Sequence, residues 1–325
     1  MPIVTGMASS HSPILFQDTY QGWMRWFNLI SAEIPQPEDV TRQDEACVMD
    51  WIKRRNRAFA ALEAALKRHS PEALIVVGGD QFEWFGAANN PNIMIHAGQD
   101  DIVGFHNYRD FDSEPLAKFW EDSHRFGVRL KVHSKLAEHL LNELVSRDFD
   151  VSISRKQNPQ GRPHLKVPHA LTRPIPLLMP QLNIPVIPII IKTTERSAAA
   201  LSGERCIALG REIGKICAEL NVPIAIYGSG GMSHDPEGPL SGWVDQVLDE
   251  WVLDCLKTGD LEKLGALFSF RSAGTDSGTG ELRTWLVAAG AMDSTRPSAA
   301  CQVVDYYPAH IATVGAGWVL WEAGN

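Results

Sequence analysis

The chain has few cysteines, and their spacing does not suggest a structural metal site. Its five cysteines form no CxxC pair, which argues against zinc ribbons and iron–sulfur clusters and favours reduced, packed thiols. The sequence has no run of about 18 consecutive apolar residues, so no membrane-spanning helix is expected. The N-terminal residues also lack a basic segment followed by a long apolar core, so we expect a cytoplasmic protein.

Positive charge is also scarce. The formal net charge is -9, and Lys and Arg form no basic stripe, which argues against a nucleic-acid partner. The phosphate-binding pattern Gly-x-x-x-x-Gly-Lys-Ser/Thr and the zinc motif HExxH are both missing. With 44% hydrophobic residues the chain can bury a large core. We therefore expect a globular protein whose partner is a small molecule.

Apolar runs and helical periodicity alternate along the chain. Short apolar runs predict buried strands at residues 3–7, 73–77, 184–191 and 222–226. Pro185 and Pro188 indicate that the third of these is an edge strand or an irregular one. Helical spacing predicts helices at residues 43–69, 114–124, 134–145, 202–220, 243–256, 260–267 and 281–287.

This alternation predicts an α/β fold with a central mixed or mostly parallel sheet covered by helices. We expect residues 1–325 to form a single compact domain. The irregular segment at 98–113 is expected to belong to an insertion that covers a pocket or forms its wall.

Polar side chains that can support chemistry stand at loop or helix entries rather than inside periodic segments. They are His11, Asp80 with Gln81, His169, His234 and Glu281. His234 is the most informative, because three glycines separate it from a buried strand. Open α/β sheets bind ligands at the carboxyl ends of their strands, so an active site is expected there.

Two kinds of chemistry suit these residue types. Non-haem Fe(II) commonly takes two histidines and one carboxylate and keeps open positions for substrate and O2, and His11 with Glu281 would fill two of the three places. A histidine can remove a substrate proton and later return it, which suits His234 or His169. Simpler roles also exist: a hydrogen bond within a turn for His11, a helix N-terminal acid for Glu281, and a cap for His234.

Five segments taken in order strengthen the enzymatic interpretation. They are SSHSP (9–13), GGDQFEWF (78–85), PHALTRPIPL (168–177), GSGGMSHDP (228–236) and GELRTWLVAAGA (280–291). Together they resemble the type II (class III) extradiol ring-cleavage dioxygenases, the protocatechuate 4,5-dioxygenase catalytic-subunit family, including its 3-O-methylgallate dioxygenase-like members. The resemblance implies Fe(II)-dependent opening of a catechol-type, carboxylated ring by O2, in a homodimer.

The resemblance also implies roles for single residues. His11 and Glu281 match metal ligands, His234 matches the catalytic acid/base, and His169 matches a histidine near the substrate. Where well-known members have Asp-His, this chain has Asp80-Gln81. Gln81 is therefore the provisional third ligand, although its amide oxygen is a weaker donor than imidazole and Glu83 or a nearby histidine could substitute.

Substrate contacts and two other classes of function complete the hypotheses. Arg173 is the candidate partner of a substrate carboxylate, and Trp84 the candidate wall for an aromatic ring. Trp23, Trp26, Phe27 and Phe85 could contribute to that wall. A non-catalytic binding protein on the same fold, which Gln81 favours, and a metal-dependent hydrolase are the alternatives.

Overall fold

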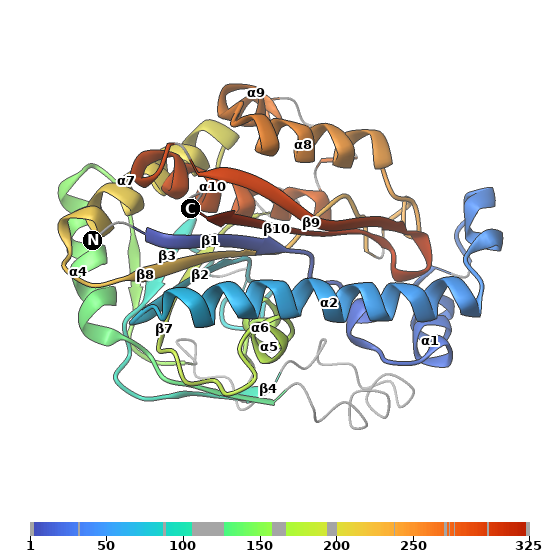
Figure 1. Cartoon of the computed structure of the whole chain (residues 1–325), viewed down its shortest axis with the longest axis horizontal. Coiled ribbons are helices and arrows are strands. Elements are labelled where there is room, and N and C mark those ends of the chain that lie inside the picture. The colour runs from blue at the N-terminus through green and yellow to red at the C-terminus, as the bar shows by residue number, and fades with distance from the viewer. Residues whose placement is uncertain are drawn as a thin grey trace.

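An eight-stranded sheet runs through the centre of the protein in the order β6-β3-β7-β2-β8-β1-β10-β9 (Figure 1). This computed structural model describes residues 3–31, 33–86, 89–105, 127–157, 167–193, 200–236, 238–269, 272, 274–275, 277–297 and 299–322. The strands of the sheet are β1 (Ile3–Ser9), β2 (Ala73–Gly78), β3 (Ile93–His96), β6 (Ser152–Ser154), β7 (Val186–Ile191), β8 (Ile224–Ser229), β9 (Ala300–Ala309) and β10 (Val314–Glu322). Strands β4 (Ile102–Phe105) and β5 (Gly127–Leu130) pair with each other separately.

The middle of the sheet is parallel. Strand β1 pairs with β8, β8 with β2, and β2 with β7, all in parallel, whereas β10 and β3 join antiparallel at either side. The expected α/β fold with a mixed, mostly parallel sheet is confirmed. The carboxyl ends of β1, β2 and β8 meet at one edge, so the segments that carry His11, Gln81 and His234 all leave from that edge.

Strand β7 lies inside the sheet, between β3 and β2, so the edge position suggested by its prolines is wrong. On the side of β7 that faces β3, Val132 bridges to Val186, and the ladder with β3 begins only at Ile189. Pro188 falls between these two pairings. A residue without an N–H is tolerated there because neither pairing needs its hydrogen bond.

Helices cover both faces of the sheet. One face packs against α1 (Tyr20–Ile30), α2 (Glu45–His69), α5 (His169–Thr172) and α6 (Ile175–Leu178). The other packs against α4 (Ser134–Ser146), α7 (Gly203–Glu219), α8 (Gln246–Thr258), α9 (Leu261–Ala266) and α10 (Leu282–Thr295). Figure 1 shows the long α2 along one face, with α8 and α9 on the opposite side.

Helix α2 illustrates why the helical segments could be predicted. The side chain of Asp44 accepts a hydrogen bond from the backbone N–H of Cys47 and caps the helix start, which contributes about 1 kcal/mol. Lys67, Arg68 and His69 occupy the last turn, where cations suit the helix dipole. The helices predicted at 134–145, 202–220, 243–256 and 260–267 correspond to α4, α7, α8 and α9.

Some expectations cannot be compared with the structure. The helix predicted at 114–124 and residues 106–113 of the irregular segment lie outside the described residues. Strands β9 and β10, by contrast, are present in the structure and were not predicted from the sequence.

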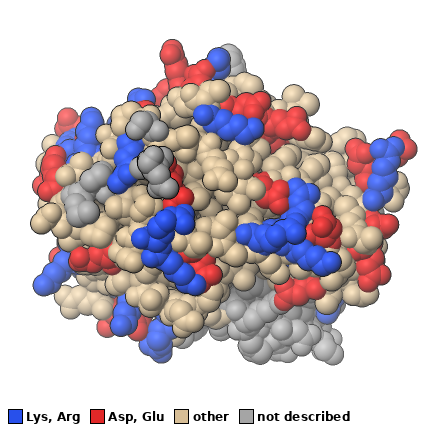
Figure 2. All heavy atoms as spheres, in the orientation of Figure 1, with Lys and Arg blue, Asp and Glu red and all other residues tan. Residues whose placement is uncertain are grey.

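The viewed surface carries charges of both signs. Figure 2 shows Lys and Arg interspersed with Asp and Glu on this face. Elsewhere in the contacts of the described residues, charges pair across elements, as Arg54 of α2 does with Asp305 of β9. No helix among the described residues is long and apolar enough to cross a membrane.

Candidate metal centre

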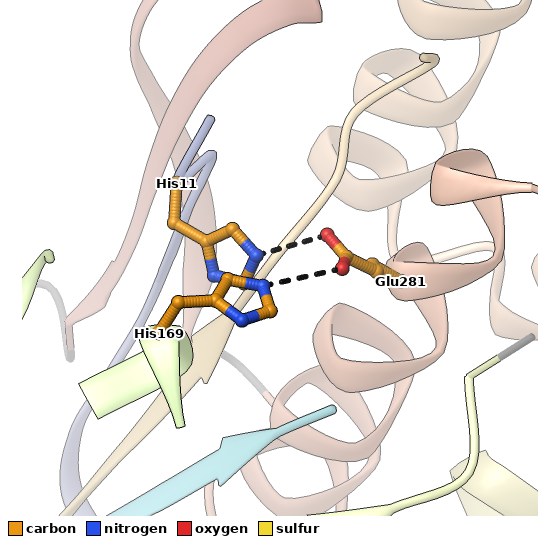
Figure 3. Close-up of side chains that lie close together, drawn as sticks. All are labelled: His11, His169 and Glu281. Carbon is orange, nitrogen blue, oxygen red and sulfur yellow. Dashed lines mark ion pairs between the residues drawn. The ribbon is translucent and has the colours of Figure 1, made fainter. Parts of the chain in front are cut away.

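Three buried side chains from distant parts of the chain point toward one another (Figure 3). His11 follows β1, His169 opens α5, and Glu281 ends the 3-10 helix η4 (Gly278–Glu281) just before α10. One donor atom from each lies within 4.8 Å of the others. Glu281 Oε2 is 3.0 Å from His11 Nε2, and Glu281 Oε1 is 3.7 Å from His169 Nε2.

Hydrogen bonds fix the tautomer of His11. Ser229 Oγ donates its proton to the carbonyl oxygen of Ala170 at 2.8 Å, so toward His11 Nδ1, at 2.9 Å, it can only accept. His11 Nδ1 therefore carries a hydrogen. Burial lowers the pKa of His11 to about 4, despite the opposing effect of Glu281. The neutral ring thus presents an unprotonated Nε2, a buried nitrogen that makes no hydrogen bond within the described part of the chain.

Glu83 has the corresponding effect on His169. Its Oε1 accepts hydrogen bonds from the backbone N–H and from Nδ1 of His169, which leaves Nε2 facing Glu281. Burial lowers the pKa of His169, but the carboxylates of Glu83 and Glu281 outweigh it and raise the pKa to about 9. Without a cation, the pocket therefore favours a proton on His169.

Glu281 is held as a carboxylate. It accepts hydrogen bonds from the backbone N–H of Gly231 at 3.1 Å and from Gln81 Nε2 at 2.9 Å. Burial raises the pKa of Glu281, but its interactions with His11, His169 and the other groups around it hold the pKa well below the ordinary value. Glu281 lies at the junction of η4 and α10, slightly before the first helical turn in which the sequence placed it.

Glycines bring these segments together. A Cβ at Gly230, where φ is +138°, would lie 2.7 Å from Cβ of Glu281, so a side chain there would push the ligand segment away. The indole nitrogen of Trp285, on α10, donates to the carbonyl oxygen of Gly230. The glycine-rich segment after β8 therefore serves the close approach of β8 and α10.

This donor set fits a divalent metal ion. His11 Nε2 directs a lone pair at a carboxylate oxygen 3.0 Å away, an arrangement that is unfavourable unless a cation lies between them. His169 Nε2 faces the same carboxylate. Two imidazoles and one carboxylate are the ligands of non-haem Fe(II) sites with open positions, and some catalytic zinc sites use the same set.

His234 stands beside this group with a different arrangement. Its Nδ1 donates to the carbonyl oxygen of Met232 at 2.8 Å, and its Nε2 lies 3.6 Å from Glu281 Oε2. The backbone N–H of His234 donates to Thr279 Oγ1, and the carbonyl oxygen of His234 accepts from the backbone N–H of Thr279. The backbone of His234 is therefore fixed to η4, its ring is held by the carbonyl oxygen of Met232, and Nε2 faces the candidate ligands.

A pocket contains these groups and most of the residues predicted from the sequence. Its lining includes His11, His169, His234 and Glu281, together with Gln81 and the buried Arg173. Gln81 contacts Glu281 as a hydrogen-bond donor. Trp84 is not among the described lining residues. It lies in the core, with its ring centroid 5.1 Å from that of His96, and Trp26 instead supplies an aromatic wall.

The structure adds residues that sequence reasoning did not single out. Ser229 orients His11 from the end of β8, and its place beside three glycines was the available signal. Asp249, on α8, accepts hydrogen bonds from the backbone N–H and hydroxyl of Ser233, next to His234. Its spacing in α8 offers no such signal, because this contact depends on how α8 packs.

The fold and the pocket define an α/β protein with a buried candidate metal site, and the comparisons with known proteins identify the family. Residues 35–318 match the family described as the catalytic LigB subunit of aromatic ring-opening dioxygenase, and the chain belongs to this family. The match includes Gln81, His169, His234 and Glu281, whereas His11 precedes it. The expected class, an extradiol aromatic ring-opening dioxygenase, is confirmed.

Individual relatives agree with this class. A 2,3-dihydroxyphenylpropionate/2,3-dihydroxicinnamic acid 1,2-dioxygenase of Comamonas testosteroni is 26% identical over 308 residues, covering 80% of this chain and 87% of that protein. A protein of the same description from Dechloromonas aromatica (strain RCB) is 28% identical over 295 residues, covering 77% and 85%. The crystal structure of the uncharacterized protein JW3007 from Escherichia coli K12 covers 99% of this chain and 100% of that one, with a TM-score of 0.56 at 13% identity, a likeness of fold alone.

Proposed function

We propose that this protein uses Fe(II) and O2 to cleave a catechol ring that carries a carboxylate, beside rather than between its hydroxyls. The observation that carries the proposal is the convergence of His11, His169 and Glu281 in a buried pocket of a ring-opening dioxygenase family member. The three side chains would hold the metal. When bound, Fe(II) supplies adjacent open positions at which the catechol oxygens and O2 come together, and it makes the substrate hydroxyls more acidic.

Of the candidates for the third ligand, which were Gln81, Glu83 and a nearby histidine, we favour a histidine, His169, over Gln81. His169 turns its imidazole Nε2, which a metal ion could bind in place of a proton, toward Glu281, whereas Gln81 directs its amide N–H at the same carboxylate. Imidazole is also the better donor for a first-row metal ion. Gln81 would then hold Glu281 in its orientation.

His234 is the proposed acid/base. Its Nε2 would take a proton from a substrate hydroxyl and return it when the ring opens. The bond from Nδ1 to the carbonyl oxygen of Met232 keeps the ring in the tautomer that this transfer needs. Because His234 Nε2 is 3.6 Å from Glu281 Oε2, the acid/base would stand beside the bound substrate.

Arg173 is the proposed partner of the substrate carboxylate. It directly follows α5, lines the pocket, is 3% exposed, and donates to the carbonyl oxygen of His11 at 3.3 Å. A buried guanidinium can bind a carboxylate with two parallel hydrogen bonds. The relatives named for 2,3-dihydroxyphenylpropionate point to a propionate side chain, whereas the sequence resemblance favours protocatechuate- or gallate-like rings.

The decisive experiment is anaerobic loading with Fe(II), iron quantitation and an oxygen-uptake screen. Substrates should include 2,3-dihydroxyphenylpropionate, protocatechuate, gallate, 3-O-methylgallate and catechol, with mass spectrometry of the products. One iron per chain and an extradiol product support the proposal. Bound iron without uptake for any of these rings would overturn the proposed substrate class, and absence of bound iron would overturn the metal dependence.

Two further measurements address Arg173 and the expected homodimer. Arg173→Met should raise KM for 2,3-dihydroxyphenylpropionate at least tenfold and leave 3-ethylcatechol, which lacks the carboxylate, nearly unchanged; Arg173→Lys keeps the cation as a control. An equal effect on both rings would contradict the assignment. Light scattering of the loaded enzyme tests the homodimer, which a monomer mass would exclude.

A further inference from the structure

We propose that Glu83 is a positioning residue that holds His169 as the third metal ligand, so that the segment after β2 orients a ligand instead of providing one. This inference rests on the metal centre of the proposed function, and it adds to that centre a residue that is not itself a metal ligand. It begins from the way the turn at residues 80–83 divides its side chains between the pocket mouth and the interior.

The turn sends Gln81 and Glu83 to different places. Gln81 is exposed and reaches Glu281 from the pocket mouth, whereas Glu83 is 5% exposed. Asp80 stabilises this turn by accepting hydrogen bonds from the backbone N–H groups of Trp84 and Phe85. Glu83 is therefore directed inward by the backbone of its own segment.

Both carboxylate oxygens of Glu83 have defined donors. Oε1 accepts from the backbone N–H of His169 at 3.2 Å and from His169 Nδ1, and Oε2 accepts from the backbone N–H of Gln81 at 2.7 Å. Burying a carboxylate is costly unless such bonds compensate for the lost water. Here one carboxylate joins the turn after β2 to the first residue of α5.

The consequence for His169 is a fixed tautomer and a fixed ring direction. With Nδ1–H bonded to Glu83, Nε2 faces Glu281 Oε1, 3.7 Å away, and the ring of His11 meets that of His169 edge-on, with 4.4 Å between the ring centroids. A carboxylate that accepts the second N–H of a ligating histidine orients the ring and raises its basicity, and its loss commonly weakens metal binding about 10- to 100-fold.

Position 81 offers a way to test this arrangement. The Gln81 side chain already lies 2.9 Å from Glu281 Oε1, so a histidine there could reach the same metal ion. If Glu83 acts through His169, then Gln81→His should compensate for the loss of either Glu83 or His169. A residue that only stabilises the fold would not be rescued in this way.

The experiment titrates the full-length, metal-free protein with Co(II), followed by calorimetry and visible absorption. We expect Glu83→Ala to raise Kd about 10- to 100-fold. Glu83→Gln, which keeps an acceptor oxygen, should fall in between, and Glu83→Ala/Gln81→His should recover most of the affinity. Glu72→Ala is the matched control, because it removes a glutamate contact to a histidine, His133, at the amino end of β2, whereas the pocket lies at the carboxyl end of that strand.

A spectroscopic readout separates orientation from general stability. Proton NMR of the Co(II) protein should show two strongly shifted, exchangeable ring N–H signals, from His11 and His169. The His169 signal should disappear in His169→Ala and broaden or exchange faster in Glu83→Ala, while the His11 signal stays.

The outcomes distinguish this inference from the proposed function. If wild-type protein does not bind Co(II) or Fe(II), the metal centre itself fails. If wild type binds but Glu83→Ala binds equally well, or keeps both N–H signals unchanged, Glu83 does not position a ligand while the dioxygenase proposal stands. A double variant as weak as Glu83→Ala would also overturn the inference, because the lost affinity would then reflect general damage.

Discussion

Replacing Gly278 by alanine tests whether the ring of His234 must stay where the structure places it. A Cβ at Gly278 would lie 2.2 Å from both Cδ2 and Nε2 of His234, whereas an ordinary contact begins at 3.4 Å. The ring would therefore have to withdraw by about 1.2 Å. Misplacing a reacting group by about 1 Å can cost on the order of 100-fold in rate, which is about 2.7 kcal/mol of transition-state stabilisation.

The assay is steady-state oxygen uptake by the Fe(II)-loaded enzyme. We expect Gly278→Ala to lower kcat about 100-fold and to keep its iron, because the atoms nearest the new methyl group belong to His234. Gly274→Ala, four residues earlier and before η4 begins, is the matched control. Its nearest neighbour would be Ser272 Oγ at 3.9 Å, so kcat should not change.

Two results would refute this reasoning. If Gly278→Ala kept wild-type kcat with an unchanged thermal midpoint, His234 would tolerate a displacement that proton transfer does not allow. If instead the variant lost its iron while Gly274→Ala kept it, the methyl group would be acting on the metal ligands, and the role of His234 would rest on other variants.

Three further predictions follow from the described contacts. His234→Gln should retain stoichiometric iron and lower kcat by about 10²- to 10⁴-fold, the range of acid/base catalysis; loss of iron would instead make His234 a ligand. Ser229→Ala removes the acceptor of His11 Nδ1–H and should weaken Co(II) binding about 10- to 100-fold. An unchanged Kd in calorimetry would contradict this role. Burial raises the pKa of Asp249 to about 7, so the native state keeps a proton there that the unfolded chain releases near pH 4. The bound proton adds to the free energy of unfolding at low pH, and this addition is lost as pH rises toward and through 7. In urea unfolding between pH 5 and pH 7, the free energy of unfolding of wild type should fall by about 2–3 kcal/mol more than that of Asp249→Asn. Equal decreases would refute the assignment.

Strands in the middle of the sheet could be predicted because both of their faces are buried. Residues 73–77 form a continuous apolar run, residues 3–7 are apolar apart from Thr5 and Gly6, and both segments end in polar or glycine-rich turns, the expected pattern for parallel strands. Strand β10 lacks this clarity because Gly315 and Gly317 interrupt it. A Cβ at Gly317 would lie 2.5 Å from the sulfur of Met232, so packing against the glycine-rich segment explains a residue that local propensity disfavours.

The site could be predicted where a residue's position in the fold determines its role. His11 and His234 follow strands whose ends meet at one edge, and that topology alone brings them together. The pairing of His169 with Glu83 depends instead on how α5 docks against the end of β2, where a Cβ at Gly78 would lie 2.4 Å from Cβ of Ala170. No spacing in the sequence encodes a contact between residues 86 positions apart.

Position 81 shows why residue type alone is a poor guide to the third ligand. A glutamine in place of an imidazole removes one donor from the strand end, and by itself this favours a protein that has lost its metal. The structure offers a different explanation, because the same turn places Glu83 against a histidine that already faces His11 and Glu281. Positions 81 and 169 then both lie beside the carboxylate of Glu281, and a histidine at either position could be the third ligand. If His169 is a ligand, His234 is the remaining histidine among the described pocket residues that could act as acid/base. His169 variants should then lose metal binding, whereas His234 variants should keep the metal and lose turnover.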